Sequence, residues 1–248
     1  MGVENSSWSF TAEEVKAACG ADRVHFVNNF EALAHSLPYL IAHDRCQINP
    51  GEPVDGAPMI VLGTGGEFGS AMLIEAFGKR ISIAGHAGHA AFAASNDREM
   101  VILKKVAGNF GYAPIQSILS GRGIEALHAA LADIEGMPEP KLGARDIIDL
   151  AIRDEDQLAS DTLDCFVSIL ARLAGDMALQ HDARGGVYIG RGITPKILKY
   201  LDNDRFCETW RNKGEMSAHL ASIPVYAILA NDAGLRGAAV ATSDAFPM

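Results

Sequence analysis

The spacing of apolar residues changes along the chain and predicts alternating strands and helices. Short runs rich in β-branched residues are typical of strands and occur at residues 24–27, 59–62, 70–76, 80–83, 186–189 and 224–229. Helical spacing or capping signals predict helices at residues 11–19, 31–35, 96–106, 113–119, 124–133, 144–151, 160–180 and 233–242, and one that begins at Thr194-Pro195. Three successive strands between residues 59 and 83 predict an antiparallel portion of sheet. Because helices alternate with the strands along the rest of the chain, the predicted fold class is α/β.

The strand that ends at Ile83 leads into Gly85-His86-Ala87-Gly88-His89, where two glycines permit close approach of the backbone. Two imidazoles three residues apart suggest a metal site, because neutral imidazole is a common metal ligand. A metal needs a third and a fourth ligand, and no other His or Cys pair in the sequence has ligand spacing. We therefore expect a tight glycine turn and no metal.

Two further stretches follow predicted strands. Asn28 and Asn29 follow residues 24–27, a position that holds ligands in α/β proteins, although either residue can equally cap the next helix. Residues 63–69 are rich in glycine, and glycine-rich turns after strands bind phosphate through backbone N–H groups. No Gly-Lys-Ser/Thr follows, so this stretch is not a Walker A loop.

Composition excludes several classes of partner. The formal net charge of −10 argues against nucleic-acid and anionic-membrane surfaces, both of which need basic patches. No apolar run is long enough to span a membrane, and the first residues lack the basic and apolar parts of a signal peptide. The four cysteines have no paired spacing, which suits reduced thiols. We expect a cytoplasmic protein with no nucleic-acid or membrane partner.

Several motifs occur in the order and spacing of one known family. They are Asn5-Ser-Ser-Trp8, Val27-Asn-Asn-Phe30, Gly63-x-Gly65-x-x-x-Gly69, Gly85-His-Ala-Gly-His89, Leu119-Ser-Gly121-x-Gly123 and Gly185-Gly-Val-Tyr-Ile-Gly-Arg-Gly-Ile-x-Pro195. On these motifs the chain resembles the bacterial glucokinases, members of the sugar-kinase and actin-like ATPase superfamily, over nearly its whole length. The resemblance implies ATP-dependent phosphorylation of glucose at the 6-hydroxyl.

The resemblance also implies the large lobe of an actin-like, ribonuclease H-like sugar-kinase fold. A mixed sheet at residues 59–83 and 186–229 would be covered by helices from residues 96–181. The family's opening Asp-x-Gly-Gly-Thr strand is not in this sequence, so the small lobe would be incomplete. The expected division is a small-lobe remnant at residues 1–40, the large lobe at 41–230 and a C-terminal small-lobe helix at 231–248.

By resemblance, the sugar-binding residues are Asn28, Asn29, His86, His89 and Gln116. Asn29 occupies the position of the aspartate that acts as general base in the family, and an amide cannot take that proton. Losing a positioned base typically costs ~10²–10⁴ in rate. His86 and Gln116 replace two sugar-binding glutamates, whose charge-assisted hydrogen bonds would be worth ~1.5–3 kcal/mol each.

By resemblance, the ATP-binding residues lie in two glycine-rich turns. They are Gly63, Gly65, Gly66 and Glu67 in the first turn, and Gly190, Arg191 and Gly192 in the second. Glu67 would place an anionic side chain near the triphosphate, and Arg191 would crowd the nucleoside. We therefore expect no tightly bound cofactor, and ATP and Mg follow from the resemblance alone.

Two functional classes follow. The first is a catalytically dead or severely impaired glucokinase-like protein that binds a hexose or regulates a partner, and the changes at sugar- and phosphate-binding positions favour it. The alternative is a genuine hexose kinase that uses His86 or Glu31 as base, with the missing lobe supplied by another chain. Without the small-lobe sheet, helices 11–19 and 233–242 would leave apolar faces uncovered, so we expect a homo-oligomer or a partner chain.

Overall fold

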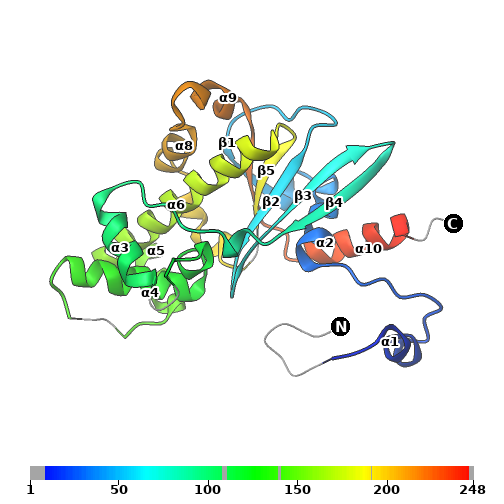
Figure 1. Ribbon diagram of the computed structural model, residues 1–248, viewed down its shortest axis with the longest axis horizontal. Helices are drawn as coiled ribbons and strands as arrows, with labels where there is room; N and C mark the ends of the chain where they lie inside the picture. Colours follow the sequence, from blue (N-terminus) through cyan, green and yellow to red (C-terminus); the bar gives the residue numbers. More distant parts are fainter. Residues whose placement is uncertain (1–8, 108–110, 139–140, 191, 246–248) are drawn as a thin grey trace.

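A computed structural model describes residues 9–107, 111–138, 141–190 and 192–245, arranged around one six-stranded sheet (Figure 1). The strand order is β1-β6-β5-β2-β3-β4. Strand β2 pairs in parallel with β5 and antiparallel with β3, so the sheet is mixed. The strands are β1 (Arg45–Asn49), β2 (Met59–Thr64), β3 (Phe68–Ala76), β4 (Lys79–Gly85), β5 (Gly186–Gly190) and β6 (Val225–Ile228).

The helices of the described ranges connect these strands or flank them. They are α1 (Ala12–Cys19), α2 (Asn29–Ser36), α3 (Asp97–Ala107), α4 (Gly121–Ile134), α5 (Ala144–Ile152), α6 (Gln157–His181), α7 (Leu198–Leu201), α8 (Asp204–Arg211), α9 (Ser217–Ser222) and α10 (Ala233–Ala245). Three short 3-10 helices bear on the site: η3 (Ala87–His89), η5 (Ile115–Ser117) and η6 (Thr194–Ile197). In the part of the chain that the structure describes, no helix is long and apolar enough to cross a membrane.

Helices cover both faces of the sheet, because successive side chains of a strand point to opposite faces. Ile60 and Leu62 of β2 belong to the hydrophobic core that contains the buried stripe of α6, whereas Val61 packs in a second core with α2. Figure 1 shows α3 to α6 on one side of the sheet and α2 with α10 on the other. Burial on both faces explains why the central strands β2 and β5 are apolar except for Thr64 at the end of β2.

Most predicted elements are confirmed to within a few residues, including the antiparallel strands between residues 59 and 85. Two predictions are wrong. Residues 24–27 form no strand, because no described strand pairs with them, and residues 113–119 contain only the single turn of η5. Strand β1 and helices α8 and α9 were not predicted, since each is short and rich in polar residues.

The C-terminal helix α10 packs directly on α2. A side chain at Gly237 would clash with the carbonyl oxygen of Ala32, so the two helices are in backbone contact. Ala233 and Ala241 share this face of α10 and are buried. The expectation of an uncovered face on helix 233–242 is therefore wrong, because α2 covers it. Helix α1 has no buried residue, and the division into lobes at residues 40 and 230 stays a prediction.

Candidate functional site

The histidine loop, residues 85–89, begins at the last residue of β4 and contains η3. Gly88 is buried in this loop, and a Cβ there would clash with the carbonyl oxygen of Phe68 and lie 3.2 Å from Oε1 of Gln116. Only glycine fits a position that close to two other chain segments. The loop is therefore held against the start of β3 and against Gln116.

Two hydrogen bonds hold the segment that contains Gln116 beside the histidine loop. The backbone N–H of Ile115 donates to the carbonyl of Ala90 at 2.9 Å, and that of Phe92 donates to the carbonyl of Ala113 at 2.8 Å. The structure thus brings His86, His89 and Gln116 together, although they lie on two separate segments. The imidazole centroids of His86 and His89 are 6.4 Å apart, and both side chains are exposed.

Metal ligation finds no support at this loop. Among the residues described by the structure, no group of three or more His, Cys, Asp or Glu side chains could hold a metal ion. The two imidazoles supply at most two ligands, and a protein metal site needs at least three.

Asn28 caps the helix that presents Asn29. The Oδ1 atom of Asn28 accepts a hydrogen bond from the backbone N–H of Phe30 at 2.8 Å, and a carboxylate oxygen of Glu31 accepts one from the N–H of Asn28 at 3.2 Å. This reciprocal capping box satisfies free N–H groups at the start of α2. Capping is therefore confirmed for Asn28, while Asn29 is the first helical residue and its side chain is exposed.

The aromatic ring of Phe30 joins α2 to the same part of the sheet that supports the histidine loop. A Cβ at Gly69 would lie inside the volume of this ring, so the absence of a side chain there lets Phe30 pack on β3. Gly69 follows Phe68, whose carbonyl lies against Gly88. The contact of Gly69 with Phe30 and the contact of Phe68 with Gly88 thus connect the start of α2, which carries Asn29, with the histidine loop.

A cavity of about 570 Å³ opens at the carboxyl ends of β2 and β5, and we call it the glycine cavity. Its lining includes Asn29, Gly65, Gly66, Gly192 and Lys196. A Cβ built at Gly66 or Gly192 would have no atom within 4 Å, so a ligand can approach the backbone there without obstruction.

Hydrogen bonds fix the turn between β2 and β3 that forms one side of the glycine cavity. The N–H of Gly65 donates to the carbonyl of Glu67 at 3.1 Å, and the carbonyl of Gly65 accepts from the N–H of Gly121, at the start of α4, at 2.8 Å. Exposed backbone and the ammonium of Lys196 suit the phosphates of a nucleotide. The residues at this cavity therefore fit the phosphates of the ATP that the resemblance implies.

Not every residue predicted for the nucleotide lies in the glycine cavity. Gly63 and Gly190 are paired with each other inside β2 and β5 and do not line it. Glu67 is exposed and does not line it either, so its carboxylate is not held against the open glycine backbone. Arg191 lies outside the described residues.

Sequence reasoning did not identify Lys196 and Asn231, which also line the glycine cavity. Lys196 directly follows Pro195, the last residue of the glycine-rich motif, and that position was a usable signal. Asn231 follows the last strand at its carboxyl end, where α/β proteins hold ligands.

A mixed α/β sheet with glycine turns at its strand ends, and polar side chains from a helix start and a loop beside them, is compatible with the actin-like fold of sugar kinases. The family model described as Glucokinase matches residues 1–245. The chain is 35% identical over 242 residues to the glucokinase of Chromobacterium violaceum, covering 98% of this chain and 70% of that protein. This chain therefore belongs to the glucokinase family.

Solved structures agree with this assignment. The crystal structure of a glucokinase from an Antarctic psychrotroph matches with a TM-score of 0.85 and 31% identity, over 94% of this chain and 72% of that one. The ROK family glucokinase of Streptomyces griseus, solved in complex with glucose and AMPPNP, matches with a TM-score of 0.62 over 92% of this chain and 70% of that one. At 18% identity, the second match shows the fold alone.

Proposed function

We propose that this chain phosphorylates a hexose, with glucose as the first candidate, using ATP, and that Asn29 limits the rate. One observation carries the proposal: Asn29, the open backbone of Gly66 and Gly192, and the cation of Lys196 line one cavity of about 570 Å³. Phosphoryl transfer depends mainly on positioning and electrostatic stabilisation, both of which a preformed cavity of this kind supplies.

The nucleotide would bind on the glycine side of this cavity. The backbone N–H of Gly66 would donate to a phosphate oxygen, and Lys196 would neutralise part of the phosphate charge. ATP supplies the transferred phosphoryl group. The S. griseus glucokinase was solved with an ATP analogue, and this supports the assignment of the same ligand to this chain.

The hexose would bind between Asn29 and the histidine loop. His86, His89 and Gln116 can each donate or accept a hydrogen bond with a sugar hydroxyl. Asn29, at the first position of α2, would contact the hydroxyl that receives the phosphoryl group. It can orient that hydroxyl but cannot remove its proton, so the proton would pass to another base or to water.

Between the two alternative bases, His86 is the better candidate. The carboxylate of Glu31 already accepts the N–H of Asn28 as part of the capping box, and moving it would remove that cap. The imidazole of His86 is exposed beside His89 and needs no such rearrangement.

A hexose-binding protein without turnover is the second candidate function. The amide of Asn29 favours it, as do His86 and Gln116 in place of carboxylates. The relatives named glucokinase, at about a third identity over most of both chains, favour the kinase. A homo-oligomer or a partner chain stays a further proposal, now based on the exposed helix α1.

A coupled assay of glucose 6-phosphate formation with Mg-ATP decides between the two functions. We expect slow, glucose-dependent turnover, roughly 10²–10⁴-fold below an ordinary kcat of ~10 s⁻¹, because Asn29 stands where the resemblance places the family's carboxylate base. The matched control is Lys196→Ala, which keeps every hexose contact and should lower the rate further. Measurable glucose binding with no product over hours would favour the second function.

A further inference from the structure

A second cavity, of about 520 Å³, lies between residues 87–95 and the C-terminal half of α6. It shares no lining residue with the glycine cavity. Its size falls within the range of small-molecule sites, roughly 300–1,000 Å³. We call it the alanine cavity, because Ala90, Ala91, Ala93 and Ala94 line one side of it.

The walls of the alanine cavity are mostly apolar. Opposite the alanines lie Ile169, Leu173 and Met177 of α6, and the ring of Phe92 closes part of the lining. Phe92 is 8% exposed and lines the cavity, so part of its surface is accessible to a ligand. Aromatic pairs gain about 0.5–1.5 kcal/mol beyond the area they bury, so this lining suits a ligand with an aromatic body.

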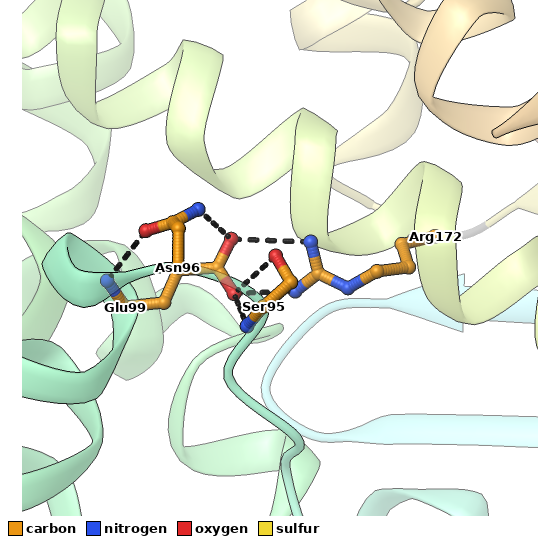
Figure 2. A network of polar contacts seen from close by, with 4 residues as sticks. All are labelled: Ser95, Asn96, Glu99 and Arg172. Carbon is orange, nitrogen blue, oxygen red and sulfur yellow. Dashed lines mark hydrogen bonds and ion pairs between the residues drawn. The ribbon is translucent and has the colours of Figure 1, made fainter.

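The charges that reach the alanine cavity are already neutralised. Figure 2 shows Arg172 paired with the buried carboxylate of Glu99, through hydrogen bonds of 2.6 and 3.1 Å. Glu99 also accepts from Ser95, at 2.8 Å from its N–H and 3.1 Å from its hydroxyl, so its oxygens are fully engaged. The second charged group, Asp176, is paired with Lys213. A ligand would therefore meet no unpaired charge on these two groups.

Polar groups remain at one end of the cavity. Within the described ranges, the side chains of Gln180 and His181, at the end of α6, have no hydrogen-bond partner. Gln180 can both donate and accept through its amide. These groups can bind one hydrogen-bonding substituent of a ligand whose remainder lies on the apolar wall.

From these observations we infer that the alanine cavity binds an uncharged aromatic molecule with one hydrogen-bonding group, and that this ligand alters hexose affinity. Neutrality follows from the paired Arg172 and Asp176, since a charged ligand would lose its hydration without gaining a counter-ion. The aromatic body follows from the ring of Phe92 beside an aliphatic wall.

The effect on the hexose rests on the proposed function, because it needs a sugar at the histidine loop. Gly85 and Ala87 belong to this loop and also line the alanine cavity. A ligand that packs against these residues contacts the same short segment that carries His86 and His89. Coupling between two sites is reciprocal, so glucose must change the affinity of the cavity ligand by the same factor.

Two fluorescent probes with the same ring system test the site. N-phenyl-1-naphthylamine is neutral, and 1-anilinonaphthalene-8-sulfonate adds a sulfonate to it. We expect saturable binding of one neutral probe per chain, at least about tenfold tighter than the sulfonate. Leu173→Trp, which fills the cavity, should weaken neutral-probe binding at least about tenfold, whereas Ile134→Trp, at an exposed apolar position on α4, should not.

Three results would overturn the inference. In the first, the sulfonate probe binds as tightly as the neutral probe or more tightly. In the second, Ile134→Trp weakens neutral-probe binding as much as Leu173→Trp does. In the third, probe binding is lost under conditions in which light scattering shows that the chain is a dimer. If Leu173→Trp fails to fold, as judged by its thermal melt, Gln180→Ala replaces it. Because Gln180 is exposed, this variant should fold and still weaken the neutral probe several-fold, and an unchanged affinity would contradict the site.

The coupling is tested by repeating the neutral-probe titration with saturating glucose. We expect a change in probe affinity on the order of fivefold or more. An unchanged affinity overturns the coupling if calorimetry shows that glucose binds. If calorimetry shows no glucose binding, the proposed function fails instead, so the two failures are distinguishable.

Discussion

The glycine cavity and the histidine loop are built from different parts of the polypeptide. The glycine cavity presents backbone at Gly65, Gly66 and Gly192, whereas the histidine loop presents side chains. A backbone site is preserved as long as the turn keeps its shape, but a side-chain site changes with every substitution. By the resemblance, Asn29, His86 and Gln116 stand at the positions of three family carboxylates. Under the proposed function, the nucleotide half of the site therefore keeps an open glycine backbone, and the hexose half has changed its chemistry.

The strongest test of this contrast restores the base. Asn29→Asp should raise kcat by ~10²–10⁴, because a positioned carboxylate can take the proton from the attacking hydroxyl. The carboxylate at the first position of α2 is also favoured by the helix dipole, which keeps it ionised. Steady-state kinetics with glucose and Mg-ATP measures the change.

The control is Asn231→Asp, which adds the same charge to the lining of the same cavity at another position. It should leave kcat unchanged or lower it. Equal acceleration by both variants would mean that general electrostatics, and not a base at position 29, limits the rate.

The second test restores the hexose side chains. His86→Glu with Gln116→Glu should raise glucose affinity by ~10²-fold, through two charge-assisted hydrogen bonds of ~1.5–3 kcal/mol each. Both residues lie on segments fixed by backbone hydrogen bonds, so the loop should keep its shape. Calorimetric titration with glucose measures the gain, and ATP affinity serves as the internal control. An unchanged glucose affinity would place the sugar elsewhere.

The third test disturbs the backbone half alone. Gly66→Asp should weaken ATP binding on the order of tenfold, because its carboxylate repels the triphosphate. Gly66→Ala is the matched control, since a Cβ at this position meets no atom within 4 Å and adds no charge. Thermal shift with Mg-ATP compares the two variants. Equal loss in both would indicate that the phosphates approach the backbone more closely than an alanine permits.

The smallest effect concerns a histidine outside the site. His128 is 2% exposed and bonded to the hydroxyl of Thr162 at 3.0 Å, and burial lowers the pKa of its imidazole. The folded state then binds fewer protons than the unfolded state below the ordinary pKa of about 6.5, so stability should fall as pH drops through that value. Urea unfolding at pH 7.5 and 5.5 should show a loss for the parent and a smaller loss for His128→Gln. Equal losses would assign the pH dependence to other groups.

The sequence predicted the fold where strands and helices carry strong periodicity. The long stripe of α6 and the antiparallel strands β2 to β4 were identified because their apolar spacing is regular and local. Residues 24–27 carry the same β-branched composition as a strand, yet no strand within the described ranges pairs with them. Strand pairing is a non-local property, and local composition does not report it. Strand β1 was missed for the opposite reason, since its pairing with β6 compensates for a polar sequence.

The site residues were predicted from motif order, and the structure added how they come together. Glycine spacing identified Gly65, Gly66 and Gly192, but the same pattern also included Gly190, which the structure assigns to packing against Ile228 and Leu33. A glycine that receives a ligand and a glycine that receives a neighbouring side chain look alike in sequence. Lys196 was missed because a single lysine carries no periodic signal, and only its position in the cavity makes it notable.

Calorimetric titration of the unmodified chain, once with Mg-ATP and once with glucose, tests the contrast between the two halves most directly. We expect ATP to bind in the ordinary micromolar-to-millimolar range for enzyme substrates, about 1 μM–1 mM, and glucose to bind more weakly than it does to the His86→Glu, Gln116→Glu variant. The contradicting result is that glucose binds as tightly to the unmodified chain as to the variant and that ATP gives no detectable heat. That result would contradict the claim that the nucleotide half of the site is intact and the hexose half is altered.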